Sequence, residues 1–188
     1  WEGFANYWRT TQLEYTWLRS LMKRHKDFWQ ITEDSLEKSM KKFNINNNMR
    51  NELLNLYKVL STFSEVKETL QNLKEKNFKL AILSNGTPEL LDHLVSTNNL
   101  ENIFDDIFSI EEVKIYKPDS RVYDLPIKKF KFRKDEIVFL SANTWDVSGA
   151  GNYGFNSIWV NRSNNIFDSL DFKPNIEIKS LNELLSIV

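Results

Sequence analysis

The chain has 188 residues, 41% of them hydrophobic and 27% charged, with a formal net charge of −1. This length suits one domain, or one domain with an appended lobe, that buries a core of its own, and the even spread of Lys and Arg gives no reason to expect a nucleic-acid surface. The lack of cysteine excludes disulfides, thiolate metal sites and a cysteine nucleophile, and no apolar stretch approaches the roughly 20 residues that span a bilayer, so a cytoplasmic enzyme or binding protein is expected.

Residues 1–62 have the pattern of an all-helical segment. The apolar side chains of the first helix recur at helical spacing and predict one apolar face, made of Trp8, Leu13, Trp17, Leu18 and Leu21. A second helix is expected to begin near Thr32, whose hydroxyl can cap it, and a third follows the turn at 46–48. The chain begins at Trp1, already in a helical pattern and without an initiator Met, which we interpret as the loss of a first element.

From residue 63 onward the pattern alternates between helix and strand, which is typical of an α/β fold. Ser64 is expected to cap a helix, and the continuous apolar run at 80–83 predicts a strand buried on both faces of a parallel sheet. Thr87, Pro88 and Glu89 predict a helix start, because they combine a capping hydroxyl, a proline at the first helical position and an acid in the first turn. Further strands are expected at 107–110, 136–141, 156–160 and 175–178.

Three strings place polar side chains at the ends of expected strands or in the loops that follow. They are LAILSNG at 80–86, VKIYKPDSRVY at 113–123 and IVFLSANTWD at 137–146. In an open α/β sheet, ligands bind in the crevice outside the carboxyl ends of the strands. The strings therefore predict a ligand site at this edge, although no nucleophile stands beside them.

Each string also has a purely structural interpretation. Ser84 and Asn85 lie between a strand and a helix N-terminus, where backbone N–H groups and the helix dipole suit an anion, yet they can also simply form a turn. Lys117 can be a solvated loop lysine, and Asp146 can be a helix cap. The occurrence of all three strings in this order in an α/β chain favours the functional interpretation.

The three strings resemble the second, third and fourth motifs of the haloacid dehalogenase superfamily. Within it, the chain is similar to the bacterial L-2-haloacid dehalogenases, also called type II haloacid dehalogenases. The stretches that carry this closer resemblance are WRTTQLEYTWLRSLM at 8–22, FSEV at 63–66 and YKPDSRVY at 116–123. The resemblance covers essentially the whole chain, and it implies an α/β fold with a helical cap at 1–62 and a Rossmann-like core at 63–188.

The same resemblance implies that the first central strand and its nucleophilic aspartate are missing. In the family this aspartate stands in a D-x-x-G-T context, and no aspartate of this chain does. Without the strand, its two neighbours are expected to keep unpaired backbone groups, which invite association with another chain. The 188-residue chain is therefore expected to be inactive and poorly soluble, and a peptide that carries the strand is expected to bind it.

The mechanism that the resemblance implies is nucleophilic catalysis by a carboxylate. The aspartate attacks C2 of a 2-haloacid, displaces halide and forms an ester that water hydrolyses, with inversion at C2. The position that matches the essential arginine is Arg9, which stabilises the departing halide together with Asn85 and Trp145. Ser84 matches the site of the substrate carboxylate, and Leu13 and Phe28 match the apolar wall that receives the alkyl part.

The remaining matched positions surround the nucleophile. Lys117 matches the lysine that keeps the nucleophile ionised, and Tyr123 orients that network. Ser141, Asn143 and Asp146 match the group that positions the hydrolytic water. Two departures from relatives are Ala142, where a second Ser is frequent, and Pro126 inside an expected helix, where a proline costs on the order of 3 kcal/mol.

Several of these residues also have an ordinary structural interpretation. Arg9 can be a surface charge, and Leu13, Phe28 and Trp145 can be ordinary core residues. Two other functions also remain open, namely a Mg²⁺-dependent phosphatase of the same superfamily and a catalytically inactive binding or scaffold protein. The dehalogenase is preferred over the phosphatase because no acid precedes Asp146 in the fourth motif, where a hard cation needs one. The expected partners are thus a small 2-haloacid, water and halide, with no cofactor, metal, nucleic acid or membrane, and a possible second copy bound through the cap.

Overall fold

The chain divides into two compact units in the computed structural model, which describes residues 1–187. The first unit comprises Trp1–Ser61, Ser84–Asn99 and Ser109–Tyr116. The second comprises Thr62–Leu83, Leu100–Phe108 and Lys117–Val188, the last residue lying outside the described part. The expected functional division into a cap at 1–62 and a core at 63–188 stays a prediction.

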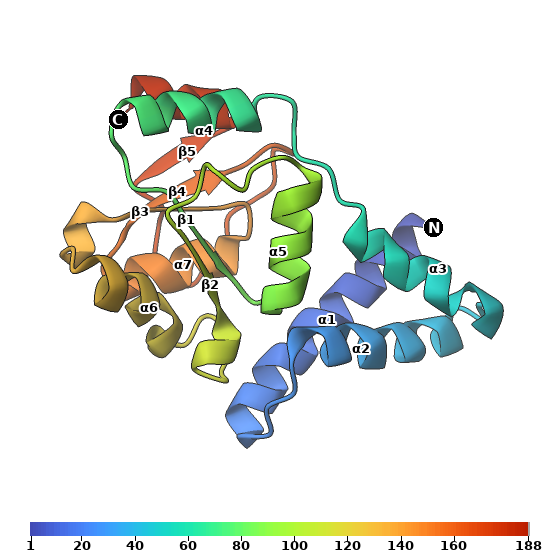
Figure 1. Ribbon diagram of the computed structural model, residues 1–188. Helices are drawn as coiled ribbons and strands as arrows, with labels where there is room; N and C mark the ends of the chain where they lie inside the picture. The colour runs from blue at the N-terminus through green and yellow to red at the C-terminus, as the bar shows by residue number, and fades with distance from the viewer. Residues whose placement is uncertain (188) are drawn as a thin grey trace. The chain divides into compact units, whose positions relative to one another are not determined.

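The first unit is helical. Helices α1 and α2 run side by side, and the apolar core between them and α3 is built from Phe4, Trp8, Leu36, Met40, Leu53 and Leu54 (Figure 1). Its elements are α1 (Glu2–Met22), α2 (Phe28–Lys42), η1 (Asn47–Met49), α3 (Arg50–Asn55), η2 (Leu56–Lys58), α5 (Pro88–Thr97) and η3 (Ile110–Glu112). The helical pattern predicted for residues 1–62 is therefore confirmed.

The buried face of α1 differs from the prediction. Leu18 and Leu21 are 43% and 80% exposed, whereas Thr11, Gln12 and Thr16 are fully buried. Gln12 and Thr16 are tolerated inside because hydrogen bonds within and between the helices satisfy their side chains. An apolar residue at helical spacing indicates a possible face, but the neighbouring helix decides which face is covered.

The start of α2 is also corrected. Asp27, rather than Thr32, is the N-cap, and its carboxylate accepts a hydrogen bond from the backbone N–H of Gln30 at 2.8 Å. An aspartate caps well because it also complements the positive end of the helix dipole. Thr32 instead lies fully buried in the second turn of the helix.

The second unit contains both sheets, although the last residues of β1 and β2 are counted with the first unit. Strands β3, β4 and β5 form a parallel sheet in that order, with Val138 opposite Asn156 and Ile158 opposite Ile176, and β1 pairs with β2 in a separate sheet. The elements are α4 (Val66–Glu75), β1 (Ala81–Ser84), β2 (Asp106–Ser109), α6 (Ser120–Phe130), η4 (Lys134–Glu136), β3 (Val138–Ser141), α7 (Thr144–Tyr153), β4 (Asn156–Val160), β5 (Ile176–Ile178) and η5 (Leu181–Ser186). All five strand regions that the sequence predicts are present.

Helices cover both faces of the three-stranded sheet (Figure 1). On one face, α4 and η5 pack on a cluster that includes Leu73, Ile158 and Leu184. On the other face, α6 and α7 pack on a cluster that includes Tyr123 and Phe155. This three-layer arrangement is the one expected of a parallel sheet whose two faces are both apolar.

The edges of β1 and β3 are unusual. Among the described residues, β1 pairs only with β2 and β3 only with β4. Even so, Leu83 of β1 and Phe139 of β3 both pack against the core cluster of Tyr123, Ala150 and Phe155. Residues 80–83 were expected to be buried on both faces, but Ala81 is exposed, as is Val138 of β3 at 39%. The prediction fails because, within residues 1–187, each of these strands pairs with a neighbour on one side only.

The helix starts confirm part of the local predictions. Thr87 caps α5 as predicted, and Asp119 caps α6 in the same way, each through its side-chain oxygen. Pro126 lies inside α6, as expected. Ser64 does not cap α4, because that helix begins one residue later, with Glu65 at the N-cap position and no side-chain cap bond.

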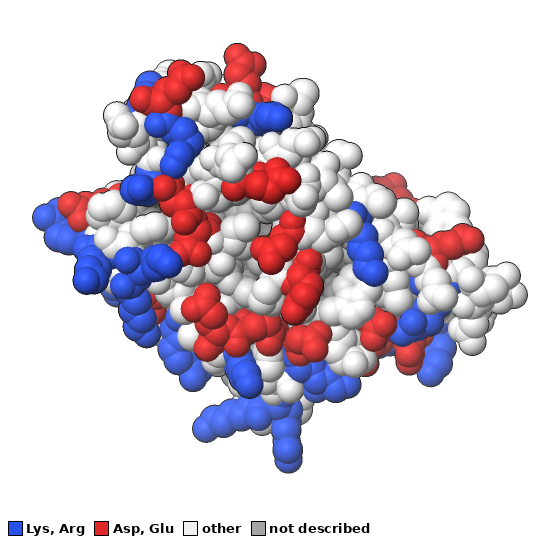
Figure 2. Space-filling view, in the orientation of Figure 1, with Lys and Arg blue, Asp and Glu red and all other residues white. Residues whose placement is uncertain are grey.

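Basic side chains gather at the C-terminal end of α6 and the turn after it, where blue atoms cluster in Figure 2. Three of them are paired, Lys128 with Asp124, Lys129 with Asp106 and Arg133 with Asp135. This local pairing offsets much of the positive charge. No helix in the described part of the chain is long and apolar enough to cross a membrane.

Candidate active site

A buried ion pair in the second unit joins two of the predicted site residues. Lys117 Nζ lies 3.0 Å from Asp146 Oδ2, and both residues are only 5% exposed. The hydroxyl of the fully buried Tyr123 donates a hydrogen bond to the other carboxylate oxygen, Oδ1, at 2.8 Å. Both oxygens of the carboxylate are therefore engaged, one by an ammonium group and one by a phenol.

Local structure brings these three side chains together. Lys117 stands just before α6, Tyr123 lies in the first turn of that helix, and Asp146 lies in the first turn of α7. The two helices approach closely at Gly149, where an added Cβ would lie 2.5 Å from Pro118 Cβ and 2.6 Å from Tyr123 Oη. Glycine is thus needed at this position to let the phenol reach the carboxylate.

The surroundings of the cluster keep the Tyr123 phenol protonated. Burial raises the pKa of Tyr123 far above the ordinary value, and the negative charge of Asp146 raises it further. The phenol therefore stays neutral and remains a donor. Lys117 Nζ also lies 4.8 Å from the centroid of the Phe139 ring, a distance at which the ring face attracts a cation.

This geometry removes two structural interpretations of the sequence. Lys117 is not a solvated loop lysine, because it is buried beside a carboxylate. Asp146 does not cap α7, because the N-cap is Asn143. A carboxylate in the first turn is still favoured by the helix dipole, which adds to the attraction of the ammonium group.

Ser141 and Asn143 lie at the carboxyl end of β3, directly before α7. The backbone N–H of Asn143 donates to Ser141 Oγ at 3.1 Å, and both side chains are half-buried. The Asn143 side chain makes no cap bond. Trp145 follows in the first turn of α7 and is also half-buried. Polar groups from one short segment thus surround the end of the strand.

Ser84 and Asn85 occupy the corresponding position at the carboxyl end of β1. Ser84 Oγ accepts a hydrogen bond from the N–H of Gly86 at 3.0 Å, which closes a tight turn over Ser84, Asn85 and Gly86. The hydroxyl of Ser84 can also act as a donor. Both side chains are half-buried. The turn leads directly into α5, whose N-terminus is capped by Thr87. The turn and the anion-binding interpretations of this segment are compatible.

The first unit carries the remaining predicted residues. Arg9 lies on α1 with an exposed side chain, and its Nη1 donates to Oε1 of Gln12 at 2.9 Å. Desolvation of the guanidinium by the surrounding protein lowers the pKa of Arg9 from its ordinary value, and the electrostatic interaction with Tyr57 partly offsets this effect. Leu13 is half-buried on the same helix, while Phe28 is buried and packs against Tyr116 with 6.4 Å between ring centroids.

Sequence reasoning missed two residues. Gln12 contacts Arg9, and the only signal for it was a polar side chain three residues after the arginine, on the same helix face. Gly149 allows α6 and α7 to approach, and a lone glycine in a helix is a weak signal. Within the described residues, no group of three or more His, Asp or Glu side chains is arranged to hold a metal ion.

The sequence profile of the haloacid dehalogenase-like hydrolases matches residues 9–160, which span both units and all three motif strings. The chain belongs to this family. It is 41% identical over 182 residues to an (S)-2-haloacid dehalogenase of Pseudomonas sp. strain YL, covering 96% of this chain and 78% of the relative. An enzyme of Burkholderia cepacia named (S)-2-haloacid dehalogenase 4A is 36% identical, covering 97% of this chain and 80% of the relative.

Solved structures of haloacid dehalogenases have the same fold. An L-2-haloacid dehalogenase with 33% identity superimposes with a TM-score of 0.96, covering 100% of this chain and 85% of the other. The L-2-haloacid dehalogenase of Xanthobacter autotrophicus, solved with chloropropionic acid covalently bound, gives 0.92 at 27% identity, covering 99% and 85%. The predicted α/β fold and the resemblance to L-2-haloacid dehalogenases are therefore confirmed.

Proposed function

We propose that the protein is an (S)-2-haloacid dehalogenase, which hydrolyses the carbon–halogen bond of short 2-haloalkanoic acids to give 2-hydroxy acids. The observation that carries this proposal is similarity along almost the whole chain to enzymes with that name. The buried cluster of Lys117, Tyr123 and Asp146 supports it, because buried titratable groups with strongly perturbed pKa values, such as the Tyr123 phenol, cluster at functional sites.

The reaction is nucleophilic displacement by a carboxylate. An aspartate oxygen attacks C2, the carbon–halogen bond breaks with its electrons leaving on the halide, and an ester results. Water then attacks the ester carbonyl, which frees the aspartate and the 2-hydroxy acid, inverted at C2. The covalently bound chloropropionic acid in the Xanthobacter enzyme supports an intermediate of this kind.

The nucleophile itself is proposed to come from a segment outside these 188 residues. No aspartate of the chain stands in a D-x-x-G-T context, and the relatives are longer than the matched region. A strand that pairs with both β1 and β3 is supported by their edges, because among the described residues each pairs on one side only and both pack on the same core cluster. Such a strand would end close to the carboxyl ends of its neighbours, where the polar residues are.

The residues of the chain divide the remaining work. Arg9, Asn85 and Trp145 are proposed to hold the departing halide, because guanidinium, amide and indole groups all present positive edges. Ser84 is proposed to bind the substrate carboxylate. The proposed apolar wall consists of Leu13 and Phe28. Lys117, with Tyr123 beside it, is proposed to keep the nucleophile ionised. The hydrolytic water is proposed to be positioned by Ser141, Asn143 and Asp146.

The test uses the protein together with the segment that carries the nucleophile. We expect halide release from (S)-2-chloropropanoate without added metal and in the presence of EDTA. Arg9→Ala is expected to lower turnover by about 10²–10³, as for the loss of one preorganised contact to developing charge. Arg133→Ala is the control, because Arg133 is exposed and pairs only locally, with Asp135 and the N-terminal end of η4.

Three results contradict the proposal in whole or in part. Hydrolysis of phosphate esters that requires Mg²⁺, with no halide release, identifies a phosphatase. No turnover of either substrate class identifies an inactive binding or scaffold protein. Preference for the (R)-enantiomer leaves a dehalogenase but removes the stereochemical assignment.

Location and assembly are further parts of the proposal. The cytoplasm is the proposed location, which fractionation of producing cells tests. A homodimer formed through the helical segment is proposed as well, supported by the exposed apolar side chains of Leu18, Leu21 and Met22 on α1. Size-exclusion chromatography with light scattering checks this, and Leu21→Lys is expected to shift a dimer to the monomer.

A further inference from the structure

A buried polar network lies beneath Arg9 in the first unit. Gln12 is fully buried, and its Oε1 accepts from Arg9 Nη1 at 2.9 Å and from Tyr57 Oη at 3.3 Å. Its Nε2 donates to Thr32 Oγ1 at 2.6 Å, and that hydroxyl donates to the carbonyl oxygen of Phe28 at 2.7 Å. One amide side chain thus connects the arginine to α2 and to η2.

The orientation of this amide is fixed by the chemistry of its neighbours. An arginine side chain can only donate hydrogen bonds, so the oxygen of Gln12 must face Arg9 and the nitrogen must face Thr32. Burial raises the pKa of Tyr57, so its phenol stays a neutral donor to the same oxygen. A buried amide with all its polar atoms engaged holds one geometry, because any rotation leaves a buried group unpaired.

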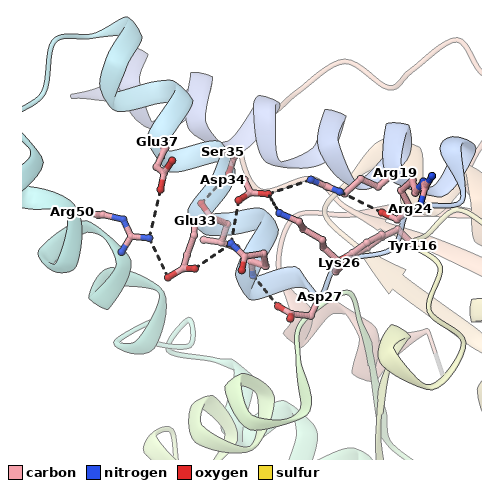
Figure 3. Close-up of polar contacts among 12 residues, drawn as sticks. Arg19, Arg24, Lys26, Asp27, Glu33, Asp34, Ser35, Glu37, Arg50 and Tyr116 are labelled. Atoms are coloured by element: carbon pink, nitrogen blue, oxygen red, sulfur yellow. Dashed lines mark hydrogen bonds and ion pairs between the residues drawn. The ribbon is translucent and has the colours of Figure 1, made fainter.

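Arg9 differs from the other arginines of these helices. Arg19 pairs with Asp34 at 3.2 Å, and Arg50 pairs with Glu33 at 3.3 Å (Figure 3). Arg9 has no ion pair with a carboxylate of its own unit among the described residues, and its hydrogen-bond acceptor is a neutral amide. A neutral acceptor orients the guanidinium without cancelling its charge, whereas a carboxylate cancels it.

We propose that Gln12 is a positioning residue that holds the Arg9 guanidinium in a fixed direction with its positive charge left available for an anion. The inference rests on the proposed function, in which Arg9 stabilises the departing halide. Gln12 touches neither halide nor substrate and acts through Arg9 alone. Its neutrality matters as much as its hydrogen bond.

The main experiment compares Gln12→Leu and Gln12→Glu in the protein with its nucleophile segment. Gln12→Leu removes the acceptor, and kcat/KM for (S)-2-chloropropanoate is expected to fall about 10²-fold, the size of effect that a misplacement of about 1 Å can cause. Gln12→Glu keeps the shape but adds a carboxylate beside Arg9. It is expected to raise KM and to weaken inhibition by bromide, since the cation is then paired.

Thr16→Val is the matched control. Thr16 lies one turn further along α1, is fully buried, and its hydroxyl donates only to the carbonyl of Leu13 in its own helix. The variant loses a buried hydroxyl without touching Arg9. Its kcat/KM is expected to stay within about twofold of the parent, even if its melting temperature falls.

A double variant separates positioning from a merely structural role. If Gln12 acts only through Arg9, Arg9→Ala/Gln12→Leu loses no more kcat/KM than Arg9→Ala alone, whereas independent effects add. Additive losses, or Gln12→Glu with unchanged KM and bromide inhibition, overturn the proposal. Gln12→Glu carries the test if Gln12→Leu does not fold.

A measurement on the side chain distinguishes failure of this inference from failure of the proposed function. In ¹⁵N NMR spectra, the Nε–H of Arg9 is expected to be ordered in the parent and mobile in Gln12→Leu, while those of Arg19 and Arg50 stay unchanged. A mobile Arg9 in the parent refutes the positioning role whatever the enzyme does. An ordered Arg9 in a protein that releases no halide refutes the proposed function and leaves the positioning intact.

Discussion

At the scale of single residues, the Lys117–Asp146 pair makes each partner dependent on the other. Both are 5% exposed, so removal of one charge leaves the other buried and uncompensated. Asp146→Asn is expected to destabilise the protein by about 3–5 kcal/mol, whereas Lys117→Met combined with Asp146→Leu is expected to cost less than either charge removed alone. Urea unfolding measures both, and a double variant that is less stable than each single one contradicts this account.

Gly149 gives a second prediction at this scale, with a control in the same chain. In Gly149→Ala the new Cβ meets Pro118 and Tyr123 at 2.5 and 2.6 Å, so α6 and α7 must separate at an expected cost of about 1–3 kcal/mol. Gly3→Ala adds the same methyl group to a helix where only Phe43 lies near, at 3.9 Å, and is expected to stabilise α1 by about 1 kcal/mol. Thermal melts that shift the same way for both variants refute the argument.

The sequence predicts the roles of some of these residues and not of others. The motif strings predicted that Lys117 and Asp146 matter, but not that they pair with each other or that Tyr123 takes the second carboxylate oxygen. Gln12 was not predicted, because a single glutamine on a helix is normally at the surface. Only the packing of α2 shows that its amide is buried.

At the scale of elements, Asp105 links α4 to the start of β1. Its carboxylate accepts from Lys74 Nζ at 2.8 Å, from Lys79 Nζ at 2.9 Å and from the N–H of Leu80 at 2.9 Å. Burial alone raises the pKa of Asp105, but these hydrogen bonds and the charge of Lys74 outweigh it and bring the pKa well below the ordinary value.

A depressed folded-state pKa gives a stability contribution that is present above the unfolded pKa of about 3.9 and is lost as pH falls through the folded value. The free energy of unfolding is therefore expected to drop below about pH 4 in the parent. In Asp105→Asn this part of the drop disappears, and stability at neutral pH falls by about 1–3 kcal/mol. Urea midpoints between pH 2 and 7 check this, and an unchanged pH dependence in the variant contradicts it.

Element boundaries were predictable where a single residue determines them. Thr87 and Asp119 start helices through their own side chains, and such caps can be read locally. The exposed face of α1 and the exposure of Ala81 in β1 were not predictable in this way. Their burial depends on which element packs beside them, which is a property of distant parts of the chain.

At the scale of the whole molecule, four of the six tyrosines share one property. Burial raises the pKa of Tyr57, Tyr116, Tyr123 and Tyr153 above the ordinary value of 10. A raised pKa gives stability that is fully present below pH 10 and is lost as pH rises further. Absorbance at 295 nm is expected to show these phenols ionising only as the protein unfolds, and near pH 10 in concentrated urea. Ionisation of these four phenols near pH 10 without unfolding contradicts the burial.

The two units are interleaved along the chain, and this has a consequence for the order of synthesis. The first unit is finished only at Tyr116, after 62–83 and 100–108 of the second have already been made. A ribosome that releases the chain from its N-terminus thus cannot deliver one completed unit before beginning the other. Larger proteins usually fold domain by domain. Here the two units must acquire their structure together, because the N-terminal helices complete their unit only with residues that are synthesised much later.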